Sequence, residues 1–139
     1  MLNDIKNIIL AGFIIYTYDM CKDDYYNNCK NIFDKFLILF HHMFNIFLQF
    51  GWLSNNKTIL KLYIIVTLGT FTHWYHNDGN CNLTEISNTR CKLNKDNYFR
   101  DIWYFVGIKQ NKNKHKYSFG VIYLIFAIII ALYKLYKKS

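Results

Sequence analysis

Apolar residues gather in four stretches of the chain, and the connecting segments hold nearly all of the charge. When an α-helix is formed, about twenty apolar residues span the ~30 Å hydrocarbon core of a bilayer. The four stretches are residues 5–20, 33–53, 58–76 and 117–136. We therefore predict an all-α, single-domain protein over residues 1–139, in which four membrane-spanning helices form a bundle.

The last stretch has the flanks of a spanning helix. It holds no charged residue before Lys134, and the side chains of Lys134, Lys137 and Lys138 can reach lipid headgroups from its end. Gly120, Ala127 and Ala131 form a small-residue face that favours packing against another helix.

The two middle stretches are joined by only four residues, Ser-Asn-Asn-Lys at 54–57. A connection this short predicts an antiparallel pair of neighbouring helices. The first stretch is marginal in length and fits a short span, an interfacial helix or a signal-peptide core. Because no small-residue cleavage site follows it, we favour a retained span.

Residues 98–108 mix aromatic side chains with Arg100 and Asp101, and their apolar core is too short to cross a membrane. This pattern predicts an amphipathic helix that lies at the membrane interface.

Composition supports a membrane protein and argues against a nucleic-acid-binding one. The chain is 53% hydrophobic and 19% aromatic, which exceeds the usual content of a soluble domain of this size. The net charge is +8, but the lysines flank the apolar stretches instead of forming one basic surface. We therefore expect the lipid bilayer, helix–helix partners or further copies of the chain as partners, and no nucleic acid.

Polar side chains recur inside two of the predicted spans at helical spacing. Successive residues turn by about 100°, which places Asp34, His41, Asn45 and Gln49 on one stripe, with His42 just beyond it. In the next span Gly69, His73 and His76 follow an i, i+4, i+7 pattern. We predict a polar bundle interior lined by His41, His42, Asn45, Gln49, His73 and His76.

His41 and His73 lie at similar predicted depths, roughly 18 and 22 Å from the turn at the helical rise. A pair of this kind, formed by His41 or His42 with His73, can ligate haem b, bind a metal or relay protons. His76 is a further candidate ligand, and a candidate zinc site consists of His73, His76, Cys81 and Cys91. The alternative is that these polar residues hydrogen-bond one another and fix the register of the helices.

The four cysteines fall in two segments that four spans would place on one side. Cys21 and Cys29, and Cys81 and Cys91, could form local disulfides in an oxidising compartment, and would stay reduced in the cytosol. The segments on this side carry three basic residues within 21–35 and eight within 90–116, against six on the other side, which favours the cytosol. The glycosylation sequence that starts at Asn82 favours a lumen instead.

The middle of the chain resembles a family of small, functionally uncharacterised multi-pass membrane proteins. These have an early histidine in one span, a Phe-rich face, a glycine at its end and a Cys-Pro-Leu-Thr loop after the next span. The matching residues here are His41, Phe44, Phe47, Gly51, Cys81, Leu83 and Thr84. Asn82 stands where that loop has proline. The resemblance supports the helical hairpin and singles out His41 and Cys81, with Thr84 in the same loop motif, but it implies no reaction.

We therefore expect a multi-pass integral membrane protein that acts as a structural or interaction component and is not an enzyme. The alternative is a small redox protein, linked to haem or quinone, or a proton or solute-transfer protein with a histidine site. The residue usage also resembles that of large DNA viruses, which would place the protein in a host or virion membrane, although an AT-rich cellular genome gives the same usage.

Overall fold

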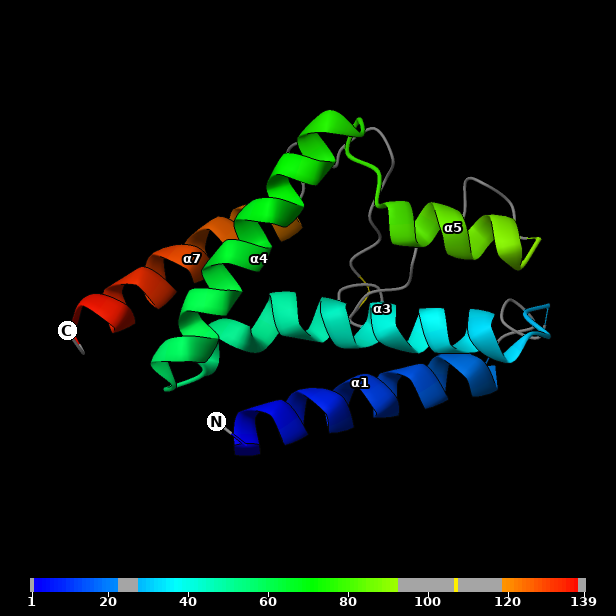
Figure 1. The fold of residues 1–139 in the computed structure, drawn as a ribbon, viewed down its shortest axis with the longest axis horizontal. Coiled ribbons are helices and arrows are strands. Elements are labelled where there is room, and N and C mark those ends of the chain that lie inside the picture. The colour runs from blue at the N-terminus through cyan, green and yellow to red at the C-terminus, as the bar shows by residue number, and fades with distance from the viewer. Residues whose placement is uncertain (1, 23–27, 93–106, 108–118, 138–139) are drawn as a thin grey trace.

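The computed structural model describes residues 2–22, 28–92, 107 and 119–137. These residues contain α-helices and one short 3-10 helix, with no β-strand among them, so the predicted all-α class is confirmed (Figure 1). The elements are α1 (Leu2–Lys22), α3 (Ile32–Phe50), η1 (Gly51–Leu53), α4 (Lys57–His76), α5 (Asn82–Arg90) and α7 (Phe119–Lys137). The predicted interfacial helix at 98–108 lies outside the described residues, apart from position 107.

Asparagine caps fix where the two middle helices begin. The Asn31 side chain accepts a hydrogen bond from the Phe33 amide, and the Asn56 side chain accepts from the amides of Thr58 and Ile59. A side-chain oxygen at this position satisfies amides that have no partner within the helix. Each helix therefore starts one residue before its predicted boundary.

Helix α5 was not predicted. Its sequence, NLTEISNTR, has too few apolar residues to produce a helical hydropathy pattern. The turn before it is formed by Asp78 and Gly79, whose φ values are 50° and 82°. Glycine favours this left-handed region, so the turn ends α4 and sends the chain back as α5.

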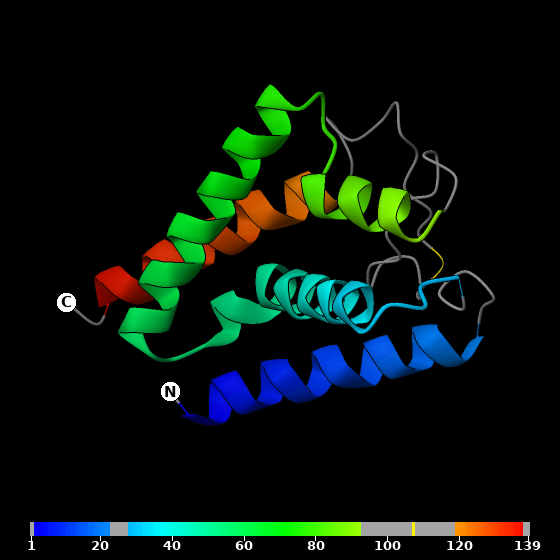
Figure 2. The same ribbon diagram turned by 45° about the vertical axis from the view of Figure 1, so that its right-hand side comes forward.

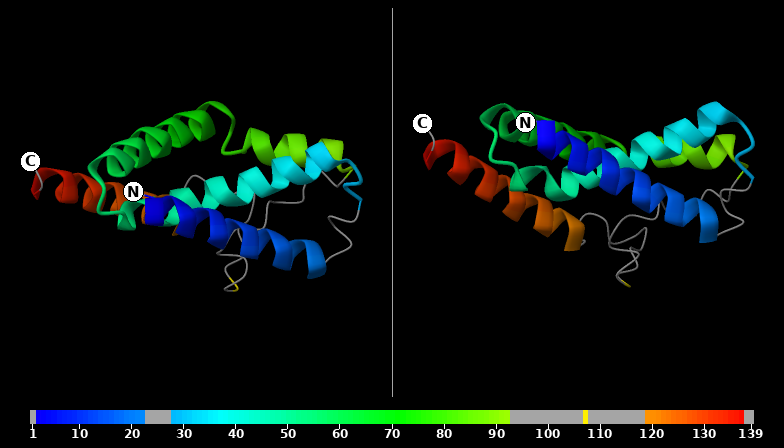
Figure 3. Two further views of the ribbon diagram at one scale, coloured as in Figure 1. Left: turned by 60° about the horizontal axis from the view of Figure 1, so that its bottom comes forward. Right: turned by 90° about the horizontal axis from the view of Figure 1, so that it is seen from below.

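Helices α1 and α3 pack antiparallel along most of their length (Figures 1 and 3). Gly12 on α1 lies close against α3, because a Cβ atom there would lie 2.8 Å from Met43 Cγ. Towards the other end, Tyr16 and Met20 of α1 pack against a small core of Cys29, Ile38 and Cys91.

Helices α4 and α7 form a second pair. Their shared core contains Leu60 and Tyr63 of α4 with Ala127 and Ala131 of α7, all fully buried. Ala127 and Ala131 of the predicted small-residue face therefore pack on a helix of the same chain.

Helices α3 and α4 contact each other only near their connection. The Tyr63 hydroxyl donates to the Leu48 carbonyl at 3.0 Å, and the Phe47 and Tyr63 rings meet edge to face. Beyond this point α4 rises away from α3, and α5 packs along α3 instead (Figures 1 and 2). The prediction of neighbouring antiparallel helices thus holds beside the turn and is wrong farther from it.

The end of α3 is held to α7 by polar contacts. Lys134 Nζ donates to the carbonyls of Trp52 and Leu53, both at 3.1 Å, and to that of Ser54 at 3.4 Å. The Tyr123 hydroxyl donates to the Gln49 carbonyl at 2.6 Å. Lys134, which we expected to reach lipid headgroups, instead satisfies carbonyls that helix termination leaves without partners.

Two described helical segments are long and apolar enough to cross a membrane, Ile32–Leu53 and Gly120–Lys137. These match two of the four predicted spans. The other two, α1 and α4, are of similar length but more polar, since α1 includes four charged residues and α4 ends in His-Trp-Tyr-His.

Candidate functional site

The polar stripe of α3 lies in the interior of the molecule. Asp34, His41, His42 and Gln49 are buried, and Asn45 is half-buried. Charged and polar side chains are rarely buried without partners. The functional candidates are therefore defined by what each of these side chains contacts.

His42 points towards α1. Its Nε2 lies 3.2 Å from Asp19 Oδ2, and both side chains are only 1% exposed. The Tyr16 ring lies edge-on to the imidazole, with 6.2 Å between the ring centroids. Sequence reasoning missed Asp19, although Gly12, Tyr16 and Asp19 follow the i, i+4, i+7 spacing of one helical face.

His41 points towards the residue that precedes α5. Its Nε2 lies 3.7 Å from the Cys81 thiol, within hydrogen-bonding distance for sulfur. The structure thus brings together the two residues that the sequence resemblance singles out.

His73 accepts a hydrogen bond from the Asn82 amide through its Nε2, at 3.3 Å. The Asn77 side chain donates to Asn82 Oδ1 at 2.8 Å and strengthens the same connection. His41 and His73, predicted to share a site, therefore contact two successive residues: His41 contacts Cys81, and His73 contacts Asn82.

His76 does not join this interior. Its side chain is exposed at the end of α4, where the Tyr75 ring lies edge-on to it at 5.4 Å. The prediction that His76 lines the interior is wrong, because α4 diverges from α3 before reaching this residue.

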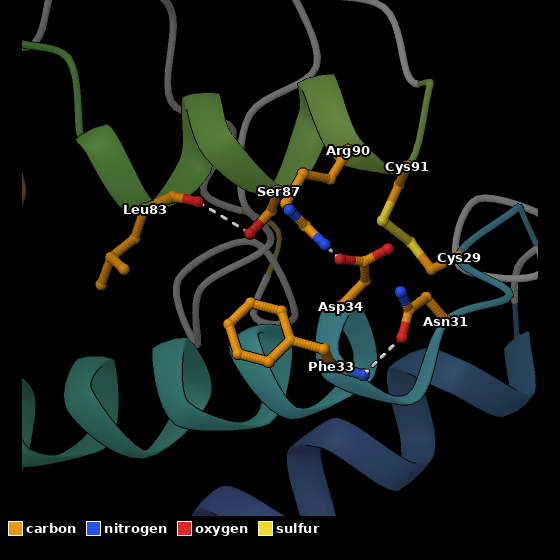
Figure 4. A network of polar contacts seen from close by, with 8 residues as sticks. All are labelled: Cys29, Asn31, Phe33, Asp34, Leu83, Ser87, Arg90 and Cys91. Carbon is orange, nitrogen blue, oxygen red and sulfur yellow. Dashed lines mark hydrogen bonds and ion pairs between the residues drawn. A yellow bond between two sulfur atoms is a disulfide. The ribbon is translucent and has the colours of Figure 1, made fainter.

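The far end of α5 is fastened to the start of α3 by charge and by a covalent bond (Figure 4). Arg90 forms an ion pair with Asp34, and its guanidinium lies 5.1 Å from the centre of the Phe33 ring. Beside this pair, Cys29 and Cys91 form a disulfide that joins segments 62 residues apart.

The disulfide corrects the predicted pairing. The expected local pairs were Cys21 with Cys29 and Cys81 with Cys91, but Cys21 and Cys81 are free thiols. The unpredicted helix α5 is the reason, since it carries Cys91 away from Cys81 and back to the beginning of α3.

These contacts chiefly join helices. Among the residues that the structure describes, no group of three or more His, Cys, Asp or Glu side chains could hold a metal ion. The zinc set considered from sequence is not assembled, because Cys91 is bonded to Cys29. Haem ligation by His41 or His42 with His73 stays a prediction.

Several residues of this polar network gave no signal in the sequence. Arg90 and Asn82 belong to the unpredicted helix, and Tyr123 resembles any aromatic residue of a spanning segment. Comparison with protein-family models, with curated proteins and with solved structures finds no match to this chain, and the family resemblance therefore stays a prediction.

Proposed function

We propose that the chain is a multi-pass integral membrane protein with four crossings, α1, α3, α4 and α7, and that it acts as a structural or interaction component of the membrane. One observation carries the proposal: the four long helices expose large apolar side chains, while many polar side chains lie inside. Apolar side chains exposed in large numbers mark surfaces that contact a membrane or another protein. In a bilayer, apolar side chains face lipid and ionisable ones face the protein interior.

The outward apolar residues occur on each long helix and include aromatic as well as aliphatic side chains. They are Ile5, Ile9, Leu10, Phe13 and Ile14 on α1, Phe36 and Phe40 on α3, Leu62, Ile65 and Leu68 on α4, and Ile122, Ile125, Phe126, Ile129 and Leu132 on α7. The buried polar residues are Asp19, Asp34, His41, His42, Gln49, Ser54, Thr67, Thr70, Ser87 and Asn88. This distribution supports lipid around the helices.

The direction of the helices supports a third crossing. Lys134, near the end of α7, contacts the carbonyls of Trp52 and Leu53 that follow α3, so α3 and α7 end on the same side. If both cross the membrane, they cross in the same direction, and the chain must return between them. In the described part of that interval, α4 is the only helix long enough to do so.

The fourth crossing is α1. It packs antiparallel on α3, and its Asp19 is shielded from lipid by the contact with His42. A charged residue inside a membrane helix is tolerated when it faces the protein and has a partner. One end of the molecule carries the N-terminus, the α3–α4 turn and the C-terminus (Figures 1 and 3). With four crossings, all three would therefore lie on the same side of the membrane.

The structural role follows from how the polar groups are used. The interactions of His41, His42, Asp34 and Lys134 each connect two different elements. Such contacts set the register of packed helices.

Membrane extraction tests this proposal. Membranes that contain the protein are washed with alkaline carbonate and then with mild detergent. We expect the protein to stay in the carbonate pellet and to enter the detergent extract. Release by carbonate alone would show that it does not cross the bilayer.

A second candidate function is a redox or transfer protein with a histidine site. The observation that favours it is the convergence of His41 and His73 on the Cys81–Asn82 peptide. Its test is the double substitution His41→Ala and His73→Ala, assayed by the absorption spectrum of the purified protein and by flux into vesicles. Loss of a Soret band or of flux in a folded variant supports this candidate, and unchanged values leave the structural role.

A further inference from the structure

We propose that the end of the molecule that carries the Cys29–Cys91 disulfide faces an oxidising compartment, and that the N-terminus, the α3–α4 turn and the C-terminus face the cytosol. This inference rests on the proposed membrane function and adds the direction in which the four helices cross. It is opposite to the orientation favoured by counting basic residues in the sequence.

The Cys29–Cys91 disulfide lies at one end of the molecule. Cys29 lies just before α3 begins and Cys91 just after α5 ends, so the bond joins two connecting segments at one end of the molecule (Figure 4). The two residues are almost fully buried, at 1% and 0% exposure, with Ile38, Tyr16 and Met20 packed around them. The bond is therefore part of the packed core at this end.

The disulfide indicates which compartment this end of the molecule faces. Disulfides form and persist in oxidising compartments, whereas cytosolic reductants keep thiols reduced. Cys29–Cys91 joins α5 to α3 beside the ion pair of Arg90 with Asp34, so the bond and the fold of this end stabilise each other. Cys21 follows Met20, which packs against the disulfide, whereas Cys81 contacts His41 in the middle of α3.

Basic residues occur on both proposed sides of the membrane. Among described residues five basic residues belong to each side: Lys22, Lys30, Lys35, Arg90 and Lys92 to the disulfide side, and Lys6, Lys57, Lys61, Lys134 and Lys137 to the other. The excess found in the sequence comes from the six basic residues between 95 and 116. On the disulfide side Arg90 is also neutralised by Asp34, while Lys6, Lys57, Lys61 and Lys137 are exposed on the other. Counted over the whole sequence, the basic residues still favour the cytosol for this side, and the proposed orientation sets the buried disulfide above that count.

Cysteine accessibility in sealed microsomes, whose outer face is cytosolic, tests the orientation. Two reporters keep the native disulfide and carry Cys81→Ser. One retains the exposed Cys21 as its free thiol, and the other replaces Cys21 with serine and carries Lys57→Cys at the exposed start of α4. Each is treated with a membrane-impermeant maleimide-polyethylene glycol, before and after detergent, and formation of the disulfide is checked by mobility on a non-reducing gel.

We expect the Lys57→Cys reporter to be modified in sealed microsomes, and the Cys21 reporter only after detergent. Modification of Cys21 in sealed microsomes, or protection of the Lys57→Cys thiol, overturns the orientation. Release of the protein by carbonate overturns the membrane function itself, so the two failures are distinguished.

Discussion

His42 Nε2 lies 3.2 Å from Asp19 Oδ2, and this contact joins α3 to α1 where both side chains are almost fully buried. Removal of one member leaves the other buried without its partner, which typically costs about 3–5 kcal/mol. We expect Asp19→Leu and His42→Leu each to lower the unfolding temperature in detergent clearly.

The double variant Asp19→Leu with His42→Leu is the matched control. Replacement of both partners by apolar residues is often neutral, because no polar group is left buried alone. We expect its unfolding temperature to lie closer to that of the native protein than either single variant. Additive losses would show that the two side chains do not act as a pair.

We expect Gly12→Ala to destabilise the packing of α1 on α3. In Gly12→Ala the new Cβ would lie 2.8 Å from Met43 Cγ and 3.0 Å from Met43 Cα, so α1 must shift away from α3. Overpacking of this kind costs about 1–3 kcal/mol. Thermal unfolding of the purified variant measures the loss.

Gly69→Ala is the comparison for Gly12, because a Cβ at this exposed position meets nothing within 4 Å. Alanine favours a helix over glycine by up to about 1 kcal/mol, so we expect no loss of stability. Equal destabilisation by the two variants would contradict a specific role for the Gly12 contact.

We expect the loss of the Lys134 ammonium to destabilise the protein, since this group donates to the carbonyls of Trp52, Leu53 and Ser54. Lys134→Met keeps much of the aliphatic length but leaves these carbonyls without the donor. Hydrogen bonds from a charged group contribute about 1.5–3 kcal/mol, and we expect a loss near the lower value because Lys134 is partly exposed. Lys137→Met, at an exposed position on the same helix, should unfold like the native protein.

We expect removal of the Cys29–Cys91 disulfide to destabilise the protein and to loosen α5. In the double variant Cys29→Ser and Cys91→Ser, α5 loses its covalent connection to α3, and stability should fall by about 2–4 kcal/mol. Amide hydrogen exchange within residues 82–91 should accelerate. In Cys21→Ser, which removes an exposed free thiol, exchange there should not change. Unaltered exchange in the double variant would show that the remaining contacts hold α5 alone.

The sequence predicts the long helices well, because each contains a sustained run of apolar residues. Boundaries shift only by a few residues, as at α4, where the Asn56 cap starts the helix at Lys57. Helix α5 could not be predicted in the same way. Its stability comes from tertiary contacts, the Arg90–Asp34 ion pair and the bond at Cys91, and not from its own amphipathic pattern.

The polar candidates were identified by residue type, but their partners were not. The spacing on α3 predicts one polar face, and the structure buries His41, His42 and Gln49 as that pattern suggests. Spacing within one helix does not specify which helix covers that face. Helix α4 was expected to cover it, whereas α1 provides Asp19 for His42 and the residue before α5 provides the Cys81 thiol for His41.

Helix α3 contacts each of the other described elements: α1, η1, α4, α5 and α7. Helix α1 packs along most of α3, and the α4–α7 pair contacts the end of α3, so a disturbance transmitted along α3 reaches both. Substitutions on α3 should consequently be less tolerated than equally conservative ones on α7. Evolutionary drift in this protein is expected to concentrate on the outer helices, with the α3 sequence as the most constrained part of the chain.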